Sequence, residues 1–138
     1  MDFRKSGEVI AVIMKDGESL SSNLLELSSS FKNHPILIIN TALGMLKEVK
    51  LGYWNGENYE IHELNEPCEL LGISGIITPS TDPSYHLHLI VGKRDGSVHG
   101  GHFIEAKVCN TIEMFLCTAE IPVERYLDGK LKKLKFRD

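Results

Sequence analysis

What this sequence lacks excludes several classes of protein. Only three of its 138 residues are cysteines, and Cys68, Cys109 and Cys117 form no Cys-x-x-Cys pair. An odd number of scattered cysteines indicates neither a disulfide framework nor a zinc ribbon, so reduced thiols are expected. No apolar run approaches the length of a membrane span, and residues 1–5 lack the apolar core of a signal peptide. The sequence therefore predicts a cytoplasmic protein with no membrane partner.

An excess of positive charge is also missing. Fifteen lysines and arginines oppose nineteen aspartates and glutamates, which gives a net charge of −4 at pH 7. Proteins that bind duplex DNA usually carry a basic surface, so general attraction to phosphate is not expected. The exception is residues 130–137, with five cations in eight residues. There Leu134 and Phe136 alternate with cations, as in an edge strand whose inward side chains are apolar and whose charges discourage aggregation.

The apolar pattern predicts a single α+β domain over residues 1–138. Leucines recur at helical spacing from Leu20 to Phe31, so a helix is expected over about 19–31, capped by Asp16 or Ser19. Strands are expected at about 8–14, 36–51, 59–64, 69–78, 85–92, 98–108, 111–120 and 131–136.

The strand expected at 111–120 is apolar on both faces. Ile112, Met114 and Leu116 point one way, while Phe115 and Cys117 point the other. One helix cannot cover both faces of a large sheet, so the sheet must curl, meet a partner chain, or do both. The predicted fold is therefore a mainly antiparallel, strongly curved, barrel-like sheet with one principal helix.

Three histidines around one turn are the candidate site for chemistry. His86 and His88 share a face of their strand, because side chains alternate along a strand. The turn signal Asp95-Gly96 follows, and then His102. A two-residue loop would place His102 opposite Leu89 and divide the histidines between the faces. A three-residue loop, with Gly96 at a positive φ, would instead place His88 directly opposite His102.

In the second register three imidazoles converge. They suit Zn²⁺ or a similar late divalent ion, and three ligands leave one coordination position open. A side chain at Gly100 or Gly101 would then crowd an ion or ligand held over the strand pair. The other interpretation is three half-exposed histidines on a polar sheet face. His99 is excluded from the site because it falls on the opposite face. His34 and His62 are expected at the surface, although His62 could approach the metal from a neighbouring strand or subunit.

The segment from Tyr85 to Glu113 resembles the plants-and-prokaryotes-conserved domain family, written PPC or PCC. The resemblance rests on His-Leu-His at 86–88, Gly-Gly-His at 100–102, and Val108, Thr111 and Glu113 after them. Looser similarity at 16–20, 44–52 and 70–77 extends it over nearly the whole chain. The resemblance implies a compact α+β domain that assembles as a homotrimer, with a divalent metal site at His86, His88 and His102.

Three functional hypotheses follow. The first is a trimeric, zinc-holding module that binds a DNA-associated or regulatory partner, as the family label suggests. Plant relatives carry an added AT-hook, an Arg-Gly-Arg-Pro segment that is absent here. Its absence argues against autonomous DNA binding. The basic residues 130–137 of three chains in a trimer would form only a local positive rim.

The second hypothesis is a metal-dependent hydrolase or lyase, because zinc with an open position lowers the pKa of bound water to about 7. Such an enzyme needs an acid or base. Glu105 and Glu113 are the nearest carboxylates in sequence, although Glu105 falls on the face opposite His102. The third hypothesis is a structural ion that only ties two strands together. An open, water-exposed site argues against the third, and the sequence alone does not decide whether the protein is an enzyme.

Overall fold

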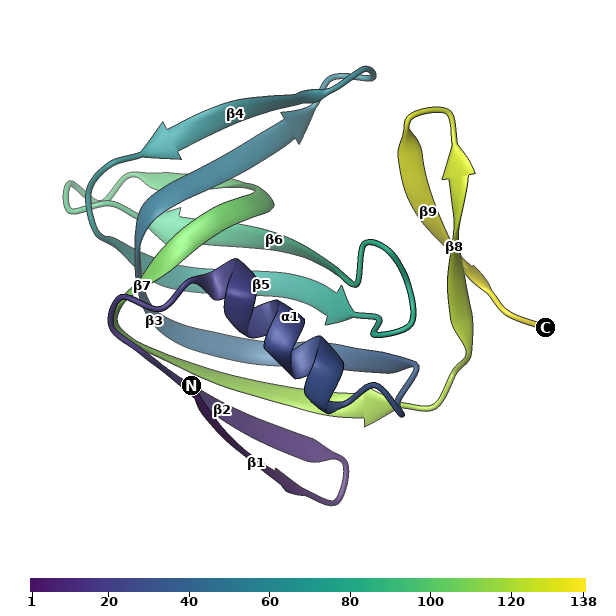
Figure 1. Cartoon of the computed structure of the whole chain (residues 1–138). Coiled ribbons are helices and arrows are strands. Elements are labelled where there is room, and N and C mark those ends of the chain that lie inside the picture. Colours follow the sequence, from purple (N-terminus) through teal and green to yellow (C-terminus); the bar gives the residue numbers. More distant parts are fainter.

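Seven of the nine strands form one antiparallel sheet in the computed structural model, which describes residues 1–138 (Figure 1). The strand order is β1-β2-β7-β6-β5-β3-β4, and β3 also pairs with β7, so that β7, β6, β5 and β3 form a closed ring of pairings. The one helix, α1, is neither long nor apolar enough to cross a membrane. The elements are β1 (Asp2–Ser6), β2 (Val9–Lys15), α1 (Leu20–Ser30), β3 (Ile36–Trp54), β4 (Tyr59–Leu64), β5 (Cys68–Ile77), β6 (Tyr85–Gly92), β7 (Val98–Ala119), β8 (Val123–Asp128) and β9 (Leu131–Phe136).

The sheet bends where the two longest strands, β3 and β7, each depart from regular geometry. Gly44 pairs with Ile112, whereas the next residue of β3 pairs with Cys109, so β7 contains a bulge between these partners. Asn110, in the bulge, has a φ of 65°, and its backbone N–H donates a 2.8 Å hydrogen bond to Asp16. The strands expected at 98–108 and 111–120 are therefore one strand, and the expected break is this bulge.

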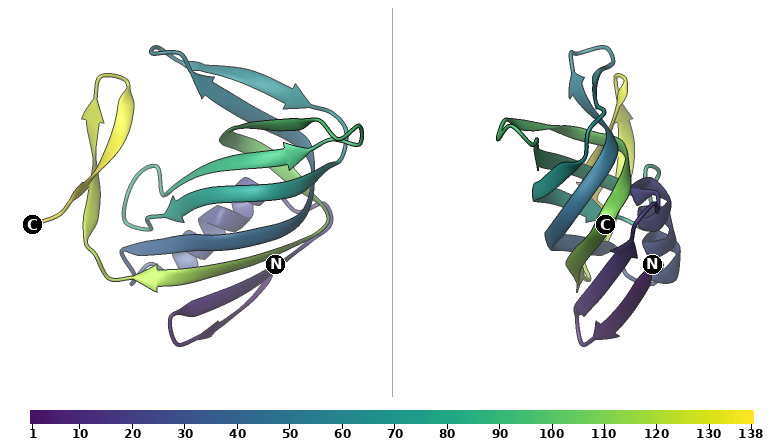
Figure 2. Two further views of the ribbon diagram at one scale, coloured as in Figure 1. Left: turned by 180° about the vertical axis from the view of Figure 1, so that it is seen from behind. Right: turned by 90° about the vertical axis from the view of Figure 1, so that its left-hand side faces the viewer.

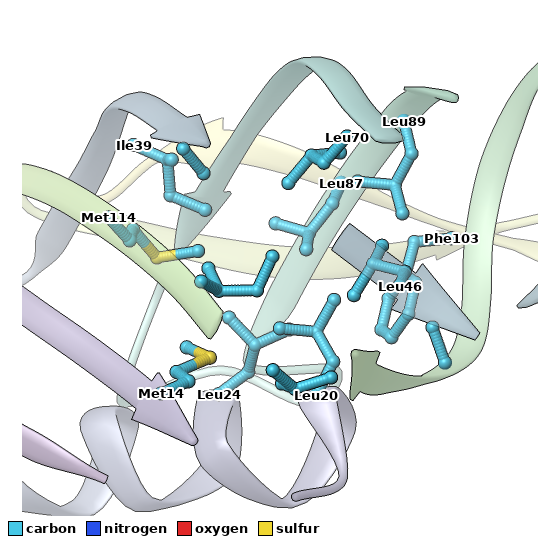
Figure 3. Close-up of a cluster of buried hydrophobic side chains, with 14 of the residues drawn as sticks. Met14, Leu20, Leu24, Ile39, Leu46, Leu70, Leu87, Leu89, Phe103 and Met114 are labelled. Atoms are coloured by element: carbon cyan, nitrogen blue, oxygen red, sulfur yellow. The ribbon is translucent and has the colours of Figure 1, made fainter. Parts of the chain in front are cut away.

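Helix α1 lies across the concave face of the sheet and closes the core (Figures 1 and 2). Ser19 is the N-cap, and its hydroxyl accepts a hydrogen bond from the Ser22 N–H at 3.1 Å. Leu20, Leu24 and Leu27 are at most 1% exposed and pack into a core of 24 residues contributed by α1, β2, β3, β5, β6 and β7 (Figure 3). The expected helix and its apolar stripe are confirmed.

The outer face of the sheet, meaning the face opposite α1, remains partly bare and apolar. Val9, Ile13, Ile38, Leu43 and Phe115 lie on β2, β3 and β7 and are 38–57% exposed. Phe115 alternates with the fully buried Met114 and Leu116, so this strand is apolar on both faces, as expected. Curling of the sheet buries one face only, and the other face of a single chain still meets solvent.

The C-terminal hairpin, β8–β9, forms a separate two-stranded sheet beside the main body (Figures 1 and 2). The strand expected at 131–136 is confirmed, whereas β8 and the N-terminal β1 were not expected. The inward orientation expected for Leu134 and Phe136 was wrong, because they are 37% and 76% exposed. β9 pairs with β8 alone and has no core beneath it. Cations of β9 instead pair with acids of β8, as Lys135 does with Glu124 at 3.1 Å.

Candidate metal centre

The turn between β6 and β7 is the three-residue loop with a bulge. The Ser97 carbonyl accepts from the Lys93 N–H at 2.9 Å, and the Lys93 carbonyl accepts from the Gly96 N–H at 3.0 Å. Gly96 has a φ of 85°, which only glycine adopts without strain. This loop length places His88 directly opposite His102, so the register that brings the histidines together is confirmed.

The three imidazoles converge on the outer face. The ring centroids of His86, His88 and His102 are separated by 5.0–5.8 Å, and one nitrogen from each ring lies within 4.8 Å of the others. Tetrahedral zinc with Zn–N bonds of about 2.0–2.1 Å holds its nitrogens about 3.3 Å apart. Small side-chain rotations toward a common centre would therefore bring the three nitrogens to bonding distance.

The ring nitrogens of these histidines are free to act as ligands. The only histidine side chains that hydrogen-bond within the chain are His34, with Glu120, and His99, with Ser97. His102 Nδ1 is buried and has no partner in the chain. Buried nitrogens are normally hydrogen-bonded, so an unpaired one beside two further imidazoles fits a site that takes a late divalent ion.

An aromatic side chain holds His102 in place from the neighbouring strands. The Tyr59 ring stacks on the His102 ring, with centroids 4.2 Å apart and planes 14° apart. Tyr59 reaches it across Gly52, which pairs with His102; a Cβ at Gly52 would lie 2.9 Å from Cδ1 of Tyr59. Sequence reasoning missed this contact, because nothing local in Tyr59 or Gly52 indicates that β3 lies between β4 and β7 at this point.

The glycines before His102 have a different role from the one expected. A Cβ at Gly101 would lie 2.9 Å from the Gly52 carbonyl oxygen, and one at Gly100 would lie 3.2 Å from the Leu89 carbonyl oxygen. Both contacts are with the backbone of neighbouring strands. These glycines allow close strand packing, and an ion is not needed to explain them.

The carboxylates suggested by the sequence lie elsewhere. Glu105 accepts hydrogen bonds from the backbone N–H and the hydroxyl of Ser21, at the start of α1, and therefore points to the core face as expected. Glu113 pairs with Ile13 and Leu43 in the apolar part of the outer face. Neither carboxylate joins the three-histidine group.

Two of the three imidazoles, those of His86 and His102, are difficult to protonate because burial lowers their pKa values. Desolvation by the surrounding chain, with smaller effects from His86 and His88, lowers the pKa of His102 to about 4. Desolvation also lowers the pKa of His86, and the charges of His88 and Arg125 add to this shift. Low pKa values keep these two imidazoles neutral, and a neutral imidazole is the form that binds a metal.

The metal-free protein is expected to lose stability as the pH falls from about 6.5 to about 4. Over this range His102 takes up a proton in the unfolded chain, where its pKa is near 6.5, but not in the folded chain, where it is about 4. The unfolded state then binds more protons, so acid favours unfolding. Urea unfolding with a chelator present, at pH 7 and at pH 5, measures this effect. Between the two pH values the free energy of unfolding should fall less for His102→Gln than for the unsubstituted protein. Equal losses would contradict this assignment.

A groove beside the histidines extends to the C-terminal hairpin. Residues of the main body and of β8–β9 line it together, and the three histidines lie in its wall. We call it the hairpin groove. Besides the histidines, its aromatic and charged lining residues are Tyr53, Trp54, Tyr59, Asp82, Tyr85, Phe103, Arg125, Lys130, Lys132 and Lys133.

Known proteins of the same fold give this geometry a context. The model of the Plants and Prokaryotes Conserved (PCC) domain matches residues 1–120, and no functionally curated protein matches the chain. A metal-containing protein from Archaeoglobus fulgidus is 26% identical, with a TM-score of 0.78 over 100% of this chain and 99% of that one.

Two further solved structures share the fold at lower identity. A plant- and prokaryote-conserved (PPC) protein from Pyrococcus horikoshii is 22% identical, with a TM-score of 0.81 over 99% of this chain and 96% of that one. A candidate DNA-binding protein from Bacteroides thetaiotaomicron is 21% identical, with a TM-score of 0.87 over 98% of this chain and 96% of that one. Together with the structure, these likenesses confirm the expected curved α+β fold.

Proposed function

This chain belongs to the Plants and Prokaryotes Conserved (PCC) domain family, and we propose that it is a homotrimeric binding module that holds a divalent metal ion, zinc, at His86, His88 and His102. Its proposed role is regulatory and DNA-associated. The observation that carries the proposal is the convergence of three imidazoles whose nitrogens have no other partner in the chain. The metal-containing relative from Archaeoglobus fulgidus supports it.

Metal content tests the centre of this proposal. A zinc ion held by three histidines keeps one position open for a ligand or water. Elemental analysis of the purified, untagged protein should find close to one metal ion per chain and identify the element. Protein that is metal-free and takes up no added zinc would contradict the proposal.

The homotrimer is proposed because the outer face needs a partner. The exposed Val9, Ile13, Ile38, Leu43 and Phe115 form an apolar patch across β2, β7 and β3, in which Glu113 lies between Ile13 and Leu43. An exposed apolar patch of this kind marks an interaction surface. The resemblance to the family implies that its partner is a second and a third copy of this chain.

We expect Phe115→Glu to dissociate the trimer, because three carboxylates would be buried in an apolar interface. The mass measured by light scattering coupled to gel filtration should then fall from three times the 15.5 kDa of one chain toward that value. Leu25→Glu, at a 52% exposed leucine on α1, is the matched control and should remain trimeric. A monomeric unsubstituted protein, or an unchanged mass for Phe115→Glu, would contradict this arrangement.

The DNA-associated role is proposed on narrower grounds. The neighbour from Bacteroides thetaiotaomicron is named as a candidate DNA-binding protein. This chain has a net charge of −4, and two of the lysines of β9 are paired with acids of β8, so a protein partner on the DNA is more consistent with its charge than direct binding. Fluorescence anisotropy with duplex DNA over a series of salt concentrations distinguishes the two, because direct binding to phosphates weakens steeply with salt.

Binding is favoured over catalysis because the site has no obvious acid or base. Glu105 is occupied at the start of α1, and Asp82 is the only carboxylate that lines the hairpin groove. The alternative is a metal-dependent hydrolase or lyase in which the ion activates water at its open position. Turnover of a test ester that disappears with the histidines would favour this alternative.

A further inference from the structure

Arg125 of β8 is held in an unusual way at the edge of the hairpin groove. Its Nε donates to the Pro83 carbonyl at 3.0 Å, and its Nη1 donates to the Lys132 carbonyl at 3.3 Å. These two acceptors belong to the β5–β6 loop and to β9, so they fix the guanidinium plane between the main body and the hairpin. The third nitrogen, Nη2, is buried and has no acceptor in the chain. A preorganised guanidinium with a free donor is suited to binding an oxyanion.

The charge of the groove is opposite to that of the protein. Its lining contains four cations, Arg125, Lys130, Lys132 and Lys133, against one carboxylate, Asp82, whereas the whole chain has a net charge of −4. Lys133 pairs with Asp128, which leaves three cations without an acidic partner in the chain. A concave surface lined by charges of one sign concentrates ligands of the other sign. An anion is therefore the ligand class that this groove favours.

The remaining walls favour an organic ligand. Half of the 28 residues that line the groove are hydrophobic, and Trp54, Tyr59 and Ile61 of the β3–β4 hairpin are among them. Trp54 and Tyr59 pack edge to face, with centroids 5.2 Å apart, so their rings form one aromatic surface in this wall. A mostly apolar groove with a few converging polar groups is typical of a small-molecule site.

We propose that the hairpin groove binds a small organic oxyanion, a carboxylate or a phosphate ester, whose anionic group lies between Arg125 and the three histidines. Its apolar body packs against Trp54 and Tyr59. The inference rests on the proposed function in one respect, since an ion at the histidines would bind the same anionic group through its open position. Arg125 and the lysines act with or without that ion.

Calorimetric titrations with benzoate, phenyl phosphate and inorganic phosphate test this inference on both zinc-loaded and chelator-treated protein. Arg125→Gln should weaken binding of the preferred aromatic anion at least tenfold in both forms. Arg137→Gln removes the same charge at a position outside the groove lining and should leave the affinity for the anion unchanged. The tighter of benzoate and phenyl phosphate then identifies the anionic group as a carboxylate or a phosphate ester.

A second variant covers the case in which Arg125→Gln loosens the hairpin. Trp54→Ala should weaken the binding of the aromatic anions several-fold and leave the binding of inorganic phosphate unchanged. A displaced hairpin would not produce this selectivity. A protein that binds zinc but no anion overturns the inference and leaves the metal site intact. The same holds if Arg125→Gln binds the anion as tightly as the unsubstituted protein does. Anion binding that depends on Arg125 in a protein that refuses zinc supports the inference and rejects the metal site. If Arg125→Gln weakens the binding of duplex DNA and not that of the small anions, the groove is a nucleic-acid surface and the inference is overturned.

Discussion

His88→Ala is expected to lower the affinity for zinc by more than about a hundredfold. Removing an outer-shell partner of a metal site already costs about 10–100-fold, and His88 is one of only three proposed ligands. The loss should be visible as protein that purifies without metal. His88 is exposed on the outer face and makes no hydrogen bond in the chain, so the free energy of unfolding of the metal-free protein should change by no more than about 0.5 kcal/mol.

Two other histidines serve as matched controls for this substitution. His62 on β4 and His99 on β7 are exposed and lie outside the three-histidine group. His62→Ala and His99→Ala should therefore retain one ion per chain by elemental analysis, with circular dichroism confirming that all three variants are folded. If His88→Ala still bound one equivalent of zinc, the assignment of the site would be wrong.

Gly44→Ala is expected to have the largest effect on folding of any single methyl group added to this protein. A Cβ at this position would lie 1.9 Å from the Thr111 carbonyl oxygen, and Gly44 has a φ of 138°, which side chains rarely allow. The contact is between two backbones, so no side chain can move aside to relieve it. Because strain at such a φ alone costs about 1–3 kcal/mol, we expect a total loss of at least about 4 kcal/mol in the free energy of unfolding.

Gly56→Ala separates the two contributions. Gly56 also has a positive φ, 99°, but a Cβ there would meet nothing within 4 Å. This variant should lose only the backbone strain, about 1–3 kcal/mol. Urea unfolding of both variants measures the difference, which is the cost of the contact at Gly44. Similar midpoints for the two would show that the bend of β3 can relax.

The features that could be predicted from the sequence depend on local signals. Leu20, Leu24 and Leu27 mark the helix by spacing alone, and Asp95-Gly96 marks the position of the turn between β6 and β7. That loop length then sets the register of His88 and His102, although the sequence left two loop lengths open. The sequence therefore reduced the pairing of His102 to two possible registers, and the structure decides between them.

The features that were missed depend on contacts between distant segments. Asn110 reads as a break in a strand, but Asp16 binds its N–H and lets β7 continue through a bulge. Tyr59 and Arg125 carry no local motif. Their roles arise because the Tyr59 ring reaches across β3 to His102 and β8 lies beside Pro83, and neither placement follows from the residues of those strands.

The separation of β8–β9 from the core has a consequence for how this protein could diversify. The family match ends at residue 120, and none of the 24 core residues lies in the hairpin that follows. Changes in β8–β9 would alter one wall of the groove without replacing any residue of the core cluster or any of the three histidines. If the groove binds an anion and the histidines bind a metal ion, as proposed, substitutions in the hairpin would change the choice of anion and leave the choice of metal to the main body.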